Sequence, residues 1–296
     1  MTQEFPFVLN VIGQGAVPRA FYDILDRFGE PVTLRFLNAF DLPFDGDPAV
    51  ILRAAREIAK DSRLDVNVVS SANRRKMLLV ADMDSTIIGV ECLDELADMA
   101  GLKPQIAAIT ERAMRGEIEF EAALKERVAM LRGLPLEALR RTYEERVRLN
   151  PGARALTSTM RAHGAHTMLV SGGFEFFTAK VAQAAGFDAE RGNRLLDDGA
   201  QLTGEVGEPI LGRQAKLEAL ESAAGALGIA LSQTLAVGDG ANDLAMIRKA
   251  GQNGGLGVAY HAKPVVAEAA GAAIVHNDLT ALLYLQGYTD ADITAA

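Results

Sequence analysis

The sequence predicts an α/β protein: a doubly wound parallel sheet with a helical insert, plus a second, small α/β domain at the N-terminus. Three observations support this prediction. From residue 77 onward, short apolar runs of strand length alternate with segments of helical spacing. Three of these runs end in polar clusters rich in Asp, Ser and Gly. The chain has 296 residues, which is enough for two domains with separate cores.

The small domain is predicted over residues 1–73. Its expected strands cover 7–12, 32–40 and 66–69, and its expected helices cover 17–28 and 50–59. The polar segment 70–76 follows and is the best candidate for a linker. We therefore expect residues 74–296 to form the catalytic part and to remain active without the first domain.

The second domain begins with an apolar strand over 77–81. A charged, largely helical stretch then interrupts the alternation of strands and helices, which predicts a helical cap at about 90–150. The expected elements after the cap are strands at 167–170, 234–237, 257–259 and 273–275 and a helix at 213–227.

Composition excludes several functions. The net charge of −9 argues against binding to nucleic acid or to an anionic membrane, because both need basic patches. No apolar run reaches membrane-spanning length, and the first residues do not resemble a signal peptide. We expect a soluble, cytoplasmic protein.

Two carboxylates, Asp82 and Asp84, directly follow the strand at 77–81. The ends of strands in open α/β sheets are where such proteins bind ligands. Strand alternation alone would point the two side chains to opposite faces, so a shared site requires the backbone to leave the strand between them. The alternative is an ordinary turn in which Asp, Ser and Thr cap backbone groups.

Polar clusters at three strand ends should meet at one edge of the parallel sheet. They are Asp82 with Asp84, Ser171-Gly172-Gly173, and Asp239 with Asn242 and Asp243. The two acidic clusters would repel each other unless a cation lay between them, and carboxylate oxygens with few other ligands suit Mg²⁺. Asn242 and Asp243 could orient the ligands or a water molecule.

A phosphoryl group needs hydrogen-bond donors and positive charge. Ser171 offers a hydroxyl group, and the backbone N–H groups of Gly172 and Gly173 can approach a ligand closely. Lys216, near the start of the helix at 213–227, is the candidate cation, and Arg213 competes for the same role.

Four ordered segments resemble the motifs of the haloacid dehalogenase superfamily. They are Asp-Met-Asp-Ser-Thr at 82–86, Ser-Gly-Gly-Phe at 171–174, Lys216, and Gly-Asp-Gly-Ala-Asn-Asp at 238–243. Further segments resemble the phosphoserine phosphatases of that superfamily: Glu91, 109–116, 120–131, 189–195 and 258–264. The resemblance covers roughly residues 77–280, and its order makes it far more specific than any single motif.

The resemblance implies a role for each motif. Asp82 would attack phosphorus, and Asp84 would protonate the leaving oxygen and later activate water. Mg²⁺ would be held by Asp82, the backbone carbonyl of Asp84, and Asp239. Ser171, Gly172, Lys216 and Asn242 would contact the substrate, with Lys216 preferred to Arg213 and Asp243 supporting the site from behind.

The same resemblance assigns substrate selection to the helical insert. Glu91 would meet the ammonium group of phosphoserine and Arg127 its carboxylate, while Met114 and Phe120 would close over the substrate. Without the resemblance, the sequence favours another interpretation of these residues. Glu91 and Arg127 would be charged residues on helix surfaces, and Met114 and Phe120 would be core residues of the insert.

The expected function is Mg²⁺-dependent hydrolysis of O-phospho-L-serine through an aspartyl-phosphate, the last step of serine biosynthesis. Alternatives are a phosphatase or phosphotransferase for another small phosphomonoester, such as phosphohomoserine, and a catalytically idle serine-binding sensor. The N-terminal domain loosely resembles an ACT-like regulatory module. Because such a unit has an open sheet edge, we also expect a homodimer.

Overall fold

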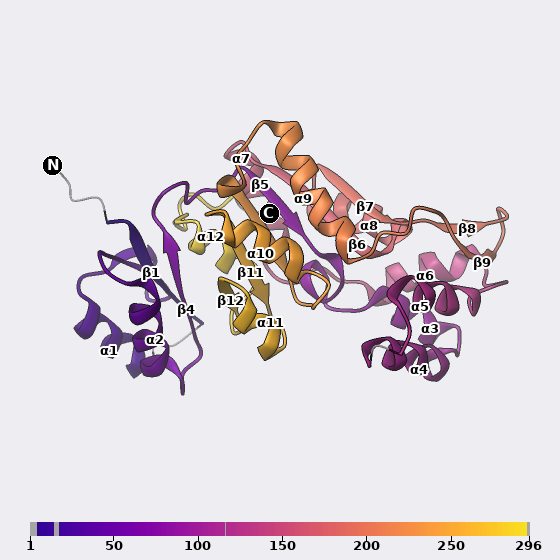
Figure 1. Ribbon diagram of the computed structural model, residues 1–296, viewed down its shortest axis with the longest axis horizontal. Coiled ribbons are helices and arrows are strands. Elements are labelled where there is room, and N and C mark those ends of the chain that lie inside the picture. Colours follow the sequence, from indigo (N-terminus) through magenta and orange to yellow (C-terminus); the bar gives the residue numbers. More distant parts are fainter. Residues whose placement is uncertain (1–4, 15–17, 116, 295–296) are drawn as a thin grey trace.

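The computed structural model describes residues 5–14, 18–115 and 117–294. Figure 1 shows three parts along the long axis: the N-terminal domain at the left, a central sheet with its helices, and the helical insert at the right. No helix in these described ranges is both long and apolar enough to cross a membrane.

The N-terminal domain is a four-stranded antiparallel sheet in the order β2-β3-β1-β4, with two helices. Its elements are β1 (Phe7–Gly13), α1 (Arg19–Phe28), β2 (Val32–Arg35), β3 (Ala39–Phe44), α2 (Pro48–Ala59) and β4 (Leu64–Ser70). The predicted single strand over 32–40 is wrong, because the chain reverses at 36–38, where Leu37 has a φ of 60°. The ACT-like assignment stays a prediction.

The central sheet has six parallel strands in the order β12-β11-β10-β5-β6-β7. The strands are β5 (Leu78–Ala81), β6 (His166–Phe174), β7 (Ala189–Asn193), β10 (Thr234–Gly238), β11 (Leu256–Tyr260) and β12 (Ala272–Ile274). The helices around it are α7 (Ala153–Ala162), α8 (Glu175–Ala185), α9 (Arg213–Leu227), α10 (Leu244–Gln252), α11 (Pro264–Ala269) and α12 (Ala281–Leu285).

Helices cover both faces of this sheet, as predicted for a doubly wound fold. Leu79 and Ala81 of β5 pack in the cluster that includes α7, α8 and α12, whereas Leu78 and Val80 pack with α9 and α10. Every residue of β5 is buried, which explains why this strand is apolar throughout rather than alternating.

The helical insert lies between β5 and β6 in the chain. It consists of α3 (Cys92–Met99), α4 (Lys103–Met114), α5 (Phe120–Ala129) and α6 (Leu136–Arg146). A hairpin that the sequence did not predict, β8 (Leu195–Asp197) with β9 (Leu202–Val206), joins the insert through hydrogen bonds between its Leu202 and the backbone of residues 133 and 134.

The N-terminal sheet docks edge to edge against the central sheet. Asn67 of β4 donates to the carbonyl of Ala273 in β12 at 3.0 Å and accepts from its N–H at 2.9 Å. The carboxylate of Asp65 accepts from the N–H groups of Val275, His276 and Asn277. Side chains of β4 thus take the place of a neighbouring strand along β12.

A second set of buried contacts ties the domain to α12. Asp41 pairs with Arg74, whose guanidinium also donates to the carbonyls of Tyr284 and Leu285. Asn10 donates to Asp41 and to the carbonyl of Tyr284. The segment 70–76 therefore connects the two domains but is not a free polar linker.

The other edge of the N-terminal sheet is also engaged, since the N–H of Asp290 donates to the carbonyl of Leu34 in β2 at 3.0 Å. Val8, Ile12 and Leu34 belong to the same apolar cluster as the core of the catalytic part. The open edge from which we expected a homodimer is thus partly covered at each side, and the homodimer stays a prediction.

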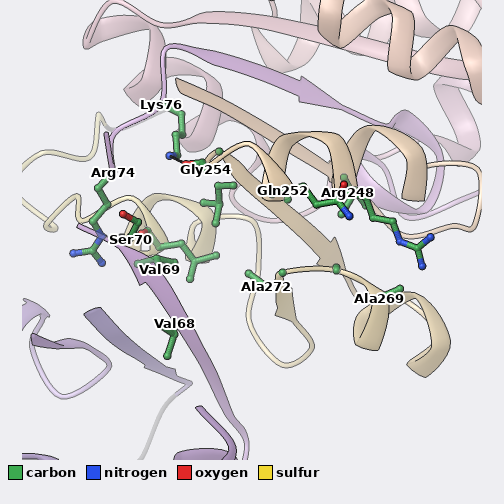
Figure 2. Close-up of a pocket in the computed structure, with 18 residues that line it drawn as sticks. Val68, Val69, Ser70, Arg74, Lys76, Arg248, Gln252, Gly254, Ala269 and Ala272 are labelled. Carbon is green, nitrogen blue, oxygen red and sulfur yellow. Dashed lines mark hydrogen bonds between the residues drawn. The ribbon is translucent and has the colours of Figure 1, made fainter. Parts of the chain in front are cut away.

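A cavity of about 440 Å³ lies at this junction (Figure 2). Residues of β4 and the segment after it, such as Val69 and Arg74, form one wall, and residues of α10 and β12, such as Gln252 and Ala272, form another. None of the predicted catalytic residues lines this cavity.

Candidate active site

The backbone leaves the strand between Asp82 and Asp84, as a shared site requires. The N–H of Asp82 still bonds to the carbonyl of Val237 in β10, but Ser85 then adopts a φ of 55° within the turn Met83–Ile87. Both carboxylates line one pocket of about 180 Å³. The other predicted residues that line it are Glu91, Phe120, Arg127, Ser171, Gly172, Gly173, Asp239 and Asn242.

Lys216 lies behind Asp82 in the floor of the site. Its ammonium nitrogen is 2.6 Å from Oδ1 of Asp82 and 2.6 Å from Oδ1 of Asp243. Burial alone would lower the pKa of Lys216, but the two carboxylates outweigh burial, so the net shift is upward. Arg213, the competing candidate, is exposed. The geometry thus favours Lys216 as the cation of the site.

Asp84 is held by two donors. Its Oδ1 accepts from the N–H of Cys92 at 2.9 Å, and its Oδ2 accepts from the hydroxyl of Ser171 at 3.1 Å. Burial raises the pKa of Asp84, while these hydrogen bonds oppose the rise. A carboxyl group that keeps a proton more readily than usual suits general acid catalysis.

The loop after β10 depends on its glycines. A Cβ at Gly238 would lie 2.3 Å from Cγ of Asp243, so no larger residue fits there. The N–H of Gly240 donates to Oδ2 of Asp243 at 2.9 Å. This packing buries Asp243 completely and places its carboxylate beside Lys216.

Three carboxylates converge where the sequence predicts the cation. Asp82, Asp239 and Asp243 can each place one oxygen within 4.8 Å of the others. Burial, and next the charge of Asp243, raise the pKa of Asp239 to about 6. Three carboxylates against the single ammonium of Lys216 leave negative charge that a divalent cation would offset, and an all-oxygen donor set fits Mg²⁺. The predicted metal ligand of Asp84 is its backbone carbonyl, and its carboxylate is hydrogen-bonded to Cys92 and Ser171.

The predicted phosphate-binding segment, residues 171–173, is a bulge in β6. The register between β6 and β7 shifts between Val170 and Phe174, so residues 171–173 leave the regular ladder. A Cβ at Gly173 would lie 2.9 Å from Oδ2 of Asp84, and one at Gly172 would lie 3.3 Å from the ring of Phe120. A side chain at Gly173 would therefore displace the Asp84 carboxylate, and one at Gly172 would press on the ring of Phe120.

The insert contributes three predicted residues to the pocket. Phe120, the first residue of α5, packs against the backbone at Gly172 and Gly212 and so closes the insert onto the sheet edge. Glu91 accepts from the hydroxyl of Ser85 at 2.7 Å. Desolvation, and next the charge of Asp84, raise the pKa of Glu91 to about 7.

Arg127 reaches the same pocket from α5. Its guanidinium donates to the carbonyl of Ala123 and to Thr110, and burial lowers its pKa. In the described part of the chain, no carboxylate oxygen lies within 4.0 Å of it. Met114 ends α4, and its side chain lies outside the described residues.

Two groups that hold the aspartates of the site were not predicted from the sequence. The backbone N–H of Cys92 holds Asp84, and Thr86 donates to Oδ1 of Asp239 at 3.4 Å. Thr86 stands in the predicted motif, so its hydroxyl could have been assigned. A backbone donor such as that of Cys92 leaves no signal in residue type.

Comparison with known proteins identifies the family of the chain. The haloacid dehalogenase-like hydrolase family matches residues 79–248. The chain is 46% identical over 214 residues to the phosphoserine phosphatase of Albidiferax ferrireducens, covering 70% of this chain and 88% of that protein.

Two solved structures are similar in fold. One is a probable phosphoserine phosphatase from Vibrio cholerae in its unliganded form, with a TM-score of 0.79 and 31% identity, covering 99% of this chain and 90% of that one. The other is a phospho-aspartyl intermediate analogue of a phosphoserine phosphatase, with a TM-score of 0.64 and 37% identity, covering 71% and 98%. The chain therefore belongs to the haloacid dehalogenase-like hydrolases and is a phosphatase of the phosphoserine phosphatase family.

Proposed function

We propose that the protein hydrolyses O-phospho-L-serine to L-serine and phosphate through an aspartyl-phosphate on Asp82, with Mg²⁺ as cofactor. In metabolism this reaction would complete serine biosynthesis. One observation carries the proposal. A single pocket of about 180 Å³ holds the Asp82–Asp84 pair together with Arg127 and Glu91, charges that match the carboxylate and ammonium of an amino acid.

In the first step, a carboxylate oxygen of Asp82 forms a bond to phosphorus while the bond between phosphorus and the serine oxygen breaks. Asp84 gives its proton to that oxygen, because an alkoxide is a poor leaving group. Lys216 favours the ionised form of Asp82 and offers charge to the phosphoryl oxygens. The hydroxyl of Ser171, which donates to Asp84 before the substrate binds, and the N–H of Gly172 would donate to those oxygens as well.

In the second step, water forms a bond to phosphorus and the aspartyl-phosphate bond breaks. Asp84 takes the proton from water, which restores both carboxyl groups. Asp82, the backbone carbonyl of Asp84, and Asp239 would hold Mg²⁺, which supplies positive charge beside the phosphoryl oxygens when bound. Asp243 keeps Lys216 in place, and Asn242 stands at the rim as a further substrate contact.

Two residues give the proposed preference for phosphoserine. Arg127 has no carboxylate partner in the described residues, so its guanidinium is available to a substrate carboxylate in bidentate fashion. Glu91 lies near Ser85 and could receive an ammonium group. Met114 and Phe120 would exclude water once the substrate is bound.

The relatives support the covalent route. The similar phospho-aspartyl intermediate analogue is a structure of a phosphoserine phosphatase, and its chain is 37% identical to this one. The intact Asp82–Asp84 pair argues against an idle sensor. A cytoplasmic location and a homodimer stay predictions that fractionation and light scattering would test.

A panel of phosphomonoesters tests the proposal. Phosphate release is measured from L- and D-phosphoserine, phosphohomoserine, a sugar phosphate and an aryl phosphate, with Mg²⁺ and after EDTA treatment. We expect the highest kcat/KM on L-phosphoserine, loss of activity with EDTA, and recovery with Mg²⁺. A higher kcat/KM on phosphohomoserine or the sugar phosphate would reject phosphoserine as the substrate. Transfer of phosphate to an added alcohol would indicate a phosphotransferase. Full activity without metal would reject Mg²⁺ as the cofactor.

A further inference from the structure

Asn193, at the end of β7, makes a set of buried contacts that the proposed mechanism does not use. Its side chain is 1% exposed. Its Nδ2 donates to the carbonyl of Gly172 at 2.8 Å and to that of Leu211 at 3.2 Å, and its Oδ1 accepts from the N–H of Leu211 at 2.7 Å. Because a backbone N–H can only donate, the Leu211 contact fixes which side of the amide faces Gly172.

These contacts join two segments of the phosphate site. Gly172 belongs to the bulge of β6, and Leu211 precedes the helix that carries Lys216. The regular pairing of β6 with β7 resumes at Phe174 and Asn193, directly after the bulge. Asn193 therefore stands where the bulge closes.

The Gly172 carbonyl shares its peptide plane with the N–H of Gly173, which points the other way. That N–H donates to Oγ of Ser171 at 2.8 Å, and the hydroxyl of Ser171 donates to Oδ2 of Asp84 at 3.1 Å. A continuous chain of hydrogen bonds thus runs from Asn193 through one peptide and one hydroxyl to Asp84. Successive bonds in such a chain polarise and orient one another.

We propose that Asn193 is a positioning residue for the phosphatase reaction, which fixes the Gly172–Gly173 peptide and, through Ser171, the orientation of Asp84. The inference rests on the proposed function for the roles of Ser171 and Asp84. It adds a residue that never touches the substrate but sets the geometry of two that do.

The test compares Asn193→Asp with a matched control. An aspartate can still accept from Leu211 but presents an oxygen to the Gly172 carbonyl, so the peptide is repelled. Thr167→Val is the control, because Thr167 lies on β6 and is buried, and its hydroxyl bonds to Asp188 at the far end of the same two strands. Asn193→Ala, which introduces no charge, replaces the aspartate variant if that one does not fold.

We expect Asn193→Asp to lower kcat about 10- to 100-fold on both phosphoserine and an aryl phosphate, as loss of an outer-sphere partner typically does. KM should change less than kcat. Thr167→Val should lower the melting temperature while leaving kcat unchanged. Wild-type kcat in Asn193→Asp, or an equal loss of kcat in Thr167→Val, would overturn the proposal.

A double-mutant cycle separates positioning from general stability. Because Asn193 acts through Ser171, we expect Asn193→Asp to change kcat less than about twofold in a Ser171→Ala background. If the fold-losses in kcat of the two single variants instead multiply in the double variant, the two residues act independently and the proposal is contradicted.

Hydrogen exchange at the Gly173 amide, measured by NMR without substrate, gives a readout independent of turnover. It should quicken in Asn193→Asp and stay unchanged in Thr167→Val. Unchanged exchange in Asn193→Asp would overturn the inference. If the wild type hydrolyses only the aryl phosphate, phosphoserine is not the substrate and the proposed function fails. The kcat of Asn193→Asp can still be compared with that of the wild type on the aryl phosphate, so the proposal for Asn193 is tested separately.

Discussion

Lys216 and Asp82 form a buried ion pair, with 2.6 Å between the ammonium nitrogen and Oδ1. Burial and the neighbouring Asp243 raise the pKa of Asp82, and the lysine opposes that rise. The pair thus offsets the cost of placing a charged nucleophile inside the protein.

Removing the lysine should therefore destabilise the protein. Lys216→Met leaves two buried carboxylates without their cation, which typically costs about 3–5 kcal/mol of unfolding free energy. Arg213→Met, on the exposed face of the same helix, should change stability by no more than about 0.5 kcal/mol. Urea unfolding of both variants measures this, and equal stabilities would show that Lys216 is not needed to compensate Asp82 and Asp243.

Changing Asp82 or Asp84 to asparagine should impair the reaction in different ways. Asp82→Asn should abolish phosphate release, because an amide does not attack phosphorus, and it should form no phosphoenzyme. Asp84→Asn should keep substrate binding but lower kcat about 10²–10⁴-fold, the usual contribution of a general acid. Rapid-quench detection of phosphoenzyme distinguishes the two, and phosphoenzyme formed by Asp82→Asn would reject this nucleophile.

The raised pKa of Asp239, about 6, predicts a pH effect in metal-free protein. Between about pH 4 and pH 6 the folded state holds a proton that the unfolded state has released, so this group stabilises the fold below that window and loses its contribution as pH rises through it. The melting temperature of the wild type should therefore fall more steeply with rising pH than that of Asp239→Asn.

At pH 7 Mg²⁺ should restore the stability lost in this window, because the cation then offsets the charge of the ionised Asp239. Binding at one hundred times the dissociation constant would add about 2.7 kcal/mol to the wild type. Identical pH slopes for wild type and Asp239→Asn, or no stabilisation by Mg²⁺, would contradict the assignment.

Arg127 should control specificity rather than chemistry. Arg127→Ala should lower kcat/KM on phosphoserine about 30- to 5,000-fold, which corresponds to the 2–5 kcal/mol typical of a lost buried charge partner. An aryl phosphate has no carboxylate and should be affected far less. Arg112→Ala is the control, since that arginine pairs with Glu126 on the surface of the insert. Equal losses on both substrates would show that Arg127 is structural.

Contacts between the domains predict that the chain unfolds as one unit. Asp41→Ala would leave Arg74, whose side chain is only 15% exposed, without its charge partner and should cost about 3–5 kcal/mol. Asp23→Ala breaks only an exposed pair with Arg19 and should cost less than about 0.5 kcal/mol. A chain that begins at residue 74 should be much less stable than the full chain, in contrast to the expectation from sequence. A stable, fully active shortened chain would show that the docking is dispensable.

The sequence predicted the elements whose apolar runs end at glycines or charged residues. The helix at 213–227 and the strands at 77–81 and 234–237 lie where the pattern placed them, within one residue. The chain reversal at 36–38 was not predicted from the sequence, because Phe36 and Leu37 continue an apolar run without glycine or proline. The sequence did not predict strand β7, the hairpin of β8 and β9, or the helices α7, α8, α10, α11 and α12.

The site was predictable where chemistry resides in side chains at strand ends, as for Asp82, Ser171 and Asp239. Backbone donors and single buried amides were not, because the resemblance at 189–195 assigns no role to Asn193. The docking of the N-terminal domain escaped for another reason. From sequence alone, Arg74 is expected to be a solvated surface charge. Only the fold shows that it pairs with Asp41, which lies thirty-three residues away in the chain.

The contact of Asn67 with Ala273 has a consequence for solubility. An unprotected edge strand offers its free N–H and C=O groups to any other extended chain, and proteins commonly shield such edges. In this protein β4 and β12 each cover the other, so the N-terminal domain protects the catalytic sheet against intermolecular strand addition. A substitution that loosens Asn67 should first appear as concentration-dependent aggregation, before any loss of catalytic rate.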